Sequence, residues 1–217
     1  MLAADSSSQS AKLIQFRMLI REMVQTLRGV CEITPAAGSA FFLRLEYLSL
    51  VDPCRIKSGE EFSDEESADI LNAALVYSVE FAAMTYLARA EHCRASLTQK
   101  LLKKNIERKA IDRALDYLES VHYLDDERFA GAWLRTRSID HAEGRIRLAA
   151  ELSSRGVHRN AAKKALDEFF EEHDQMDICR RAYKKISAVK RDDDKIKSSL
   201  LQKGFTMKEI ESVMKEA

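Results

Sequence analysis

Asp125, Asp126 and Glu127 stand in a row, and such a run could supply catalytic carboxylates or ligands for a metal ion. Helix physics gives a more economical explanation. As N-cap, Asp125 can accept hydrogen bonds from the free amides of the first turn, and the helix dipole favours negative charge at the next two positions. Leu124 and Phe129 have the spacing of a hydrophobic staple across that start. The run therefore predicts the beginning of a helix rather than a reactive centre.

Basic side chains follow, and they could bind an acidic protein surface or nucleic-acid phosphates. Nine Lys and Arg stand against three Asp and Glu between positions 128 and 164, a local excess of six in a chain with 35 basic and 35 acidic residues. For any single arginine, a solvated helix face is an equally good interpretation. As a group they predict a partner-binding surface, whose candidate residues are Arg128, Arg135, Arg137, Arg145, Arg147 and Arg155, extended by Lys103 and Lys104.

Apolar side chains at helical spacing accompany the basic ones. Tyr123 and Leu124 precede the helix start, and Phe129 and Trp133 lie four residues apart along it. Trp is enriched in binding hot spots, but this spacing favours packing in a core. We therefore expect Phe129 and Trp133 to be buried and Arg135 to lie on the opposite face.

Other residue types give no positive sign of catalysis, of a metal site or of a cofactor. The five histidines lack a second ligand at a useful spacing, and no nucleophile elbow, Walker A loop or dinucleotide-binding motif occurs. The four cysteines are widely scattered, which favours free thiols in a reducing compartment. The first ten residues do not resemble a secretory signal. These observations predict a cytoplasmic protein that is not an enzyme.

Seven Gly and two Pro in 217 residues argue for long helices and short turns. The N-terminal extension, 1–62, differs, because alternating apolar residues around 26–33 and 40–48 predict a small β-hairpin. A short helix is expected at 47–51, and the pattern at 12–24 leaves helix and extended chain open. Further on, 70–88 is nearly long enough to span a bilayer, but its polar residues favour a buried helix, opened by a capping box at 63–66.

The sequence also repeats itself, at offsets of 51 and 48 residues. The corresponding turn positions are Asn105, Gly156 and Gly204, and Asn or Gly is what a left-handed helix C-cap requires. We predict a mainly α protein with three tandem three-helix repeats, 63–122, 123–172 and 173–217, in an elongated array.

Four pieces in order, "ALVYSVEFAAMTYLARAEHCRASLTQKLLKKNI", "YLDDERFAGAWLRTR", "GRIRLAAELSSRGV" and "LLQKGF", resemble the RecX family, bacterial regulators of the RecA recombinase. The resemblance runs from about Ser63 to the C-terminus. It implies tandem three-helix repeats and a monomer that docks on the RecA filament and inhibits the recombinase and its coupled ATPase. That role belongs to DNA repair, homologous recombination and the SOS response. A helical-repeat protein that binds DNA directly, or a scaffold for another protein, is the alternative.

Two departures from the family pattern stand in the first repeat. Members usually have Gly where His122 stands, and a Ser-x-x-Glu capping pair where Cys93 and Ser96 stand. We expect the capping to shift to Ser96 and Gln99, which would start that helix three residues later.

Overall fold

A computed structural model describes residues 17–27 and 29–216 of the chain. The chain divides into two compact units between Ser78 and Val79, inside its longest helix.

The first unit is built on a four-stranded antiparallel sheet with strand order β3-β2-β1-β4. Its strands are β1 (Met18–Leu27), β2 (Val30–Pro35), β3 (Phe41–Arg44) and β4 (Glu61–Phe62). The predicted hairpin is therefore confirmed as β2 and β3. Of the two alternatives at 12–24, the extended one is correct from residue 18 onward, and 12–16 lie outside the described residues.

The short helix expected at 47–51 is wrong. A single 3-10 turn, η1 (Leu45–Tyr47), ends at the first residue of that range, and a second, η2 (Pro53–Arg55), follows the range. The cause is Asp69, whose carboxylate accepts the amides of residues 49, 50 and 51 at 2.8 to 3.1 Å. Since these amides bind a side chain, they are not available for helical hydrogen bonds.

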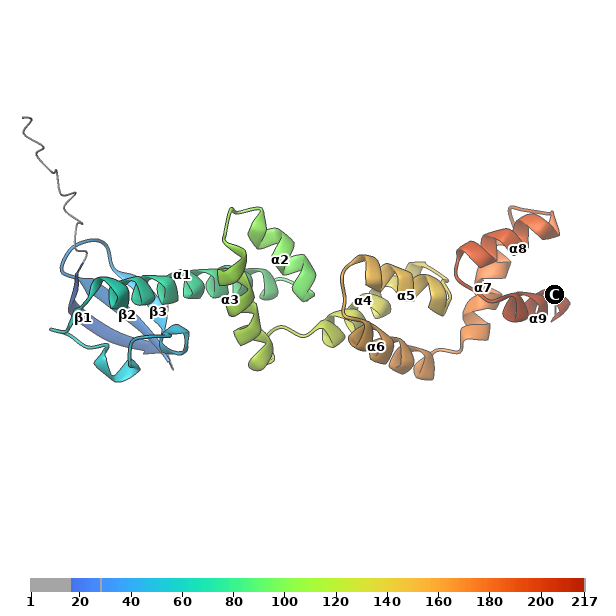
Figure 1. Cartoon of the computed structure of the whole chain (residues 1–217). Helices are drawn as coiled ribbons and strands as arrows, with labels where there is room; N and C mark the ends of the chain where they lie inside the picture. Colours follow the sequence, from blue (N-terminus) through green and yellow to red (C-terminus); the bar gives the residue numbers. More distant parts are fainter. Residues whose placement is uncertain (1–16, 28, 217) are drawn as a thin grey trace, which may run out of the picture. The chain divides into compact units, whose positions relative to one another are not determined.

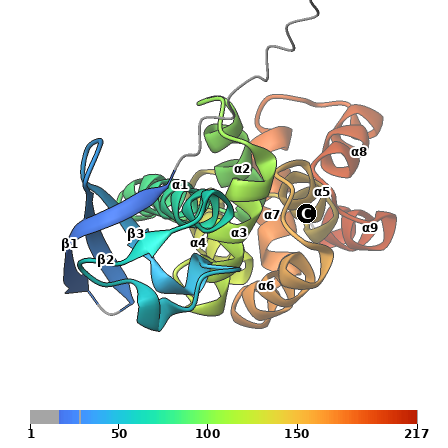
Figure 2. The same cartoon turned by 60° about the vertical axis from the view of Figure 1, so that its left-hand side comes forward.

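Helix α1 (Asp64–Leu87) opens with the predicted capping box. Ser63 N donates to Glu66 Oε2 at 2.9 Å, and Glu66 N donates to Ser63 Oγ at 3.3 Å. The backbone hydrogen bond from Ser63, with help from Arg55, lowers the pKa of Glu66. The helix packs on the sheet, where Met18 N donates to Ser67 Oγ at 3.1 Å (Figure 2).

The expectation that α1 is a buried helix holds for one side only. Leu71, Leu75 and Phe81 are exposed, because they lie on the face turned away from the buried positions. Within the described ranges, α1 is the one helix long and apolar enough to cross a membrane, and 33% of its most apolar window is buried.

The second unit contains the C-terminal part of α1 and eight further helices (Figure 1). These are α2 (Arg94–Leu102), α3 (Arg108–Ser120), α4 (Asp126–Asp140), α5 (Arg145–Ser154), α6 (Arg159–Glu172), α7 (Gln175–Ser187), α8 (Asp193–Gln202) and α9 (Met207–Glu216). We group them into repeat 1 (end of α1, α2, α3), repeat 2 (α4 to α6) and repeat 3 (α7 to α9), and we propose the boundaries 63–122, 123–172 and 173–217 for these repeats.

The turn after the second helix of each repeat has the left-handed conformation that the sequence predicts. The φ angles are +58° at Asn105, +78° at Gly156 and +85° at Gly204. In repeats 2 and 3 the next residue closes a Schellman-type bond, from Val157 N to Leu152 O and from Phe205 N to Leu200 O. His122 also has a positive φ, of +59°.

One apolar core runs through repeats 2 and 3. It includes Leu134 of α4, Leu152 of α5 and Leu200 of α8, and Cys93 from the start of α2 joins it. Phe129 and Trp133 are only half-buried and pack against its edge, so their expected full burial is not reached.

Candidate partner-binding surface

The acidic run begins α4 as predicted. The Asp125 carboxylate accepts from Glu127 N at 2.8 Å and from Arg128 N at 3.1 Å, and Leu124 is buried beside it. Arg128 closes the preceding turn, since its guanidinium donates to Glu91 Oε1 and to the carbonyls of residues 122 and 123. The hydrogen bond to Glu91 raises the pKa of Arg128.

Asp126 has a role that the sequence did not reveal. Its carboxylate accepts from Arg94 N at 2.8 Å and from His158 N at 3.3 Å, so it links the starts of α2 and α6. The predicted shift of the α2 start to Ser96 is therefore wrong. The helix begins at Arg94 after Cys93, which makes no side-chain cap, because Asp126 supplies the cap from another repeat.

Trp133 lies beneath two of the candidate arginines. The Arg155 guanidinium is 4.6 Å from the centre of the indole ring, and that of Arg137 is 6.0 Å away. Both cations are also paired: Arg155 Nη1 donates to Glu151 at 2.6 Å, and Arg137 donates to both Glu143 oxygens at 2.8 and 3.0 Å. The group is a structural network of charges over a half-buried aromatic ring at the edge of the core.

Two further arginines of α5 are paired in the same way. Arg145 is bound to Asp167 and lies 5.6 Å from the Phe170 ring. Arg147 Nη2 lies 2.6 Å from Glu151 Oε1, in the i,i+4 arrangement typical of exposed helix pairs.

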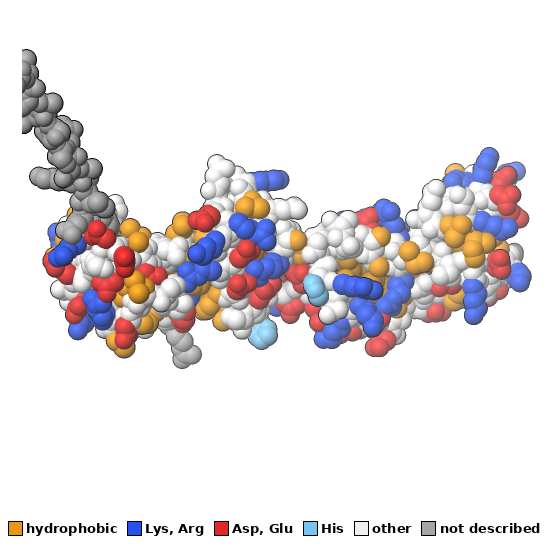
Figure 3. Space-filling view, viewed as in Figure 1, with side chains coloured by type: hydrophobic (Ala, Val, Ile, Leu, Met, Phe, Trp, Pro, Cys, Tyr) orange, Lys and Arg blue, Asp and Glu red, His pale blue; other side chains and the backbone are white. Residues whose placement is uncertain are grey.

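Arg135 differs from the other five, because it is exposed and forms no ion pair with any residue that the structure describes. In repeat 1, Lys104 Nζ lies 5.3 Å from the centre of the Tyr86 ring, and Lys103 is the exposed C-cap of α2. Figure 3 shows Lys and Arg side chains gathered over the middle repeat.

The local excess of six positive charges is thus partly cancelled within the chain. Glu91 and Asp167, which neutralise Arg128 and Arg145, both lie outside the sequence window that gave the excess. A charge count over one stretch of sequence does not include the ion-pair partners that other helices supply. The assignment of the arginines to partner binding remains a proposal, and Arg135 and Lys103 are exposed members of it that form no ion pair with a described residue.

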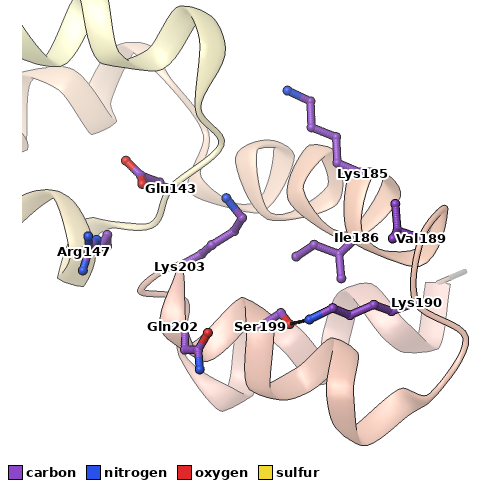
Figure 4. Close-up of a pocket in the computed structure, with 9 residues that line it drawn as sticks. All are labelled: Glu143, Arg147, Lys185, Ile186, Val189, Lys190, Ser199, Gln202 and Lys203. Atoms are coloured by element: carbon purple, nitrogen blue, oxygen red, sulfur yellow. Dashed lines mark hydrogen bonds between the residues drawn. The ribbon is translucent and has the colours of Figure 1, made fainter.

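A second basic group, which sequence reasoning missed, surrounds a cleft of about 660 Å³ between repeats 2 and 3 (Figure 4). Its cations are Arg147 from α5, Lys185 and Lys190 from α7 and the loop after it, and Lys203 from the end of α8. Its one carboxylate is Glu143, whose pKa is held low chiefly by the hydrogen bond from Arg137. The run "YKKISAVKR" contains two of these lysines and was a signal that could have been used.

Two glycines bring the walls of this cleft together. Gly144 N donates to Lys203 O at 2.8 Å, and a β-carbon on Gly204 would lie 2.2 Å from Arg147 N. Since glycine has no side chain, the end of α8 can contact the backbone at the start of α5.

Models of the RecX family match two segments: the first three-helix domain at 82–118 and the second at 125–166. The regulatory protein RecX of Treponema pallidum (strain Nichols) is 36% identical over 128 residues, which are 59% of this chain and 78% of that protein. The chain belongs to the RecX family. RecX of Geobacillus kaustophilus is 31% identical over 166 residues, 74% of this chain and 61% of that protein.

Solved structures show the same fold. A crystal structure of regulatory protein RecX has a TM-score of 0.72 and 19% identity, and the match covers 91% of this chain and 99% of that one. RecX from Lactobacillus salivarius has a TM-score of 0.58 at 24% identity, over 65% of this chain and 96% of that one.

Proposed function

We propose that this RecX-family chain is a non-catalytic, cytoplasmic regulator that binds RecA filaments on DNA and inhibits the recombinase and its coupled ATPase. The observation that supports this most is the shared core and close junction of repeats 2 and 3, together with membership of a family of regulatory proteins. Repeats that contact only their neighbours expose an extended surface, which suits binding to adjacent subunits of a polymer.

In this proposal the docking surface is basic, and the exposed Arg135 and Lys103 contact the partner. The ion pairs of the other arginines keep the surface in shape; these are Arg137, Arg145, Arg147 and Arg155. Reversal of Arg135 to Glu should weaken binding without unfolding repeat 2, because an exposed charge contributes little to stability. Reversal of Arg145 is a poorer probe, since it also leaves Asp167 without its partner.

Direct binding to DNA through the basic side chains of the repeats is the alternative function. Co-sedimentation distinguishes the two. Regulation of the filament predicts that the protein pellets with RecA-coated DNA and binds naked DNA far less at moderate salt. Equal binding to both, with a steep fall as salt rises, would favour phosphate contacts and counterion release.

A further inference from the structure

The lysines of the cleft between repeats 2 and 3 form no ion pair with the residues that the structure describes. Lys190 Nζ donates to Ser199 Oγ at 2.7 Å, and Lys185 Nζ donates to the carbonyl of Asp140 at 3.4 Å. Both acceptors are neutral. Among the residues that the structure describes, no carboxylate lies within ion-pair distance of Lys185, Lys190 or Lys203, in contrast to five of the six candidate arginines of repeat 2.

Glu143 is the one acidic side chain among the described residues that line the cleft, and it attracts Lys203 without forming an ion pair with it. Glu143 already receives two hydrogen bonds from Arg137 and is buried. Figure 4 shows the Lys203 side chain extending toward it, yet the two form no ion pair. The negative C-terminal end of a helix attracts cations, which explains why Lys185 and Lys203 lie at the ends of α7 and α8. It does not explain the position of Lys190, which lies in the loop after α7.

The cleft also has an apolar wall. Ile186 and Val189 line it beside the lysines, and Val189 is 84% exposed. An exposed aliphatic side chain between cations suits a ligand that brings an apolar group together with negative charge.

Nucleic acid fits these features less well than protein. None of the described residues that line the cleft is aromatic, although stacking on aromatics is how single strands are commonly held. Arg147, the arginine of the cleft, already pairs with Glu151.

We propose that this cleft binds an acidic segment of a partner protein, with carboxylates at Lys185, Lys190 and Lys203 and an apolar side chain against Ile186 and Val189. The inference rests on the proposed function for the source of the segment, which is the regulated recombinase. The chemistry of binding does not depend on that source.

The test measures fluorescence anisotropy of a labelled twelve-residue peptide of alternating Glu and Leu, titrated with the full chain. The cleft variant is Lys185→Glu, Lys190→Glu, Lys203→Glu. The matched control reverses three exposed lysines of repeat 3 that do not line the cleft, Lys195→Glu, Lys208→Glu and Lys215→Glu. We expect the cleft variant to bind the peptide about tenfold more weakly than the control does, although both have the same net charge.

Three further arms keep the result decisive. Lys→Gln at the same cleft positions removes the charge without repulsion and replaces the reversal if that fails to fold. A Gln-for-Glu peptide should not bind, and a dT12 oligonucleotide should be insensitive to the cleft variant. The proposal would be overturned if the cleft and control variants bound the peptide equally, or if the natural chain did not bind it. It would also be overturned if the cleft variant lost dT12 binding and kept peptide binding.

The same two variants separate this inference from the proposed function. If the natural chain binds the peptide but leaves the recombinase ATPase unchanged, the cleft is correct and the proposed function is wrong. If the cleft variant loses the peptide and still inhibits fully, the segment does not come from the recombinase, and that part of the inference fails.

Discussion

Gly144 and Gly204 lie in direct backbone contact between repeats 2 and 3: a β-carbon on Gly144 would lie 2.4 Å from the carbonyl oxygen of Gly204. The same relationship occurs one repeat earlier, where a β-carbon on Gly156 would lie 2.5 Å from Ala95 Cβ, and Cys93 Sγ donates to the carbonyl of Arg155. At both junctions, the first turn of the second helix of one repeat contacts the turn that follows the second helix of the next repeat.

Gly204→Ala should destabilise the chain by about 3 kcal/mol, because it combines an unfavourable positive φ with a clash against the Arg147 backbone. Gly59→Ala isolates the first effect, since Gly59 has φ +86° and a β-carbon added to it would have nothing within 4 Å; it should cost about 1 to 2 kcal/mol. Urea unfolding gives both values. Equal losses of unfolding free energy in Gly204→Ala and Gly59→Ala would show that the junction is not tightly packed.

Gly131→Ala is the control for the chemical change itself. Gly131 lies inside α4, and an added β-carbon would meet only the flexible end of Arg135, at 3.3 Å. Higher helix propensity should stabilise this variant by up to about 1 kcal/mol.

Asp126→Ala should cost about 1 to 2 kcal/mol, because it removes the cap that Arg94 N receives from another repeat. Cys93→Ser in the same chain should recover part of the loss, since serine at this N-cap supplies a local acceptor. Thermal unfolding of the two single variants and the double variant measures the coupling. Strict additivity would mean that Asp126 does not act as the cap of α2.

Trp133→Ala should destabilise repeat 2 by roughly 2 to 4 kcal/mol, less than a fully buried Trp, because the ring is half-buried. Trp133→Phe keeps an aromatic face for Arg155 and should cost less. Loss of recombinase inhibition in a Trp133→Ala protein of unchanged stability would instead identify Trp133 as a binding residue.

The pair formed by Glu143 and Arg137 predicts a dependence of stability on pH. The hydrogen bond from Arg137 lowers the pKa of Glu143 in the folded state, so its contribution is present above the ordinary pKa of 4.5 and is lost as the pH falls through the lower folded value. Glu143→Gln should lower stability by about 1 to 3 kcal/mol at pH 7. The gap between the two proteins should narrow in acid, and a gap independent of pH would contradict this role.

The sequence predicted the local features well. The caps at Asp125 and Ser63, the left-handed turns at Gly156 and Gly204 and the β2–β3 hairpin follow from the identity of neighbouring residues. Contacts between distant segments were not predictable in this way. The carboxylate of Asp69 that prevents a helix at 49–51, and that of Asp126 that caps α2, come from elements 18 to 32 residues away.

The candidate surface shows the same limit. Charge type and helical spacing located the arginines, but their pairing with Glu91 and Asp167 depends on how helices pack. The cleft lysines do not form one group in the sequence, because Lys203 lies beside Lys185 and Lys190 only when α7 and α8 pack together.

The most direct test of the central claim is the DNA-dependent ATPase rate of the cognate recombinase, measured as this chain is added from substoichiometric to equimolar amounts. A regulator that binds the filament predicts a progressive fall in the rate, and the Lys195, Lys208, Lys215 control variant should inhibit as the natural chain does. A rate that stays unchanged up to equimolar protein would contradict the account.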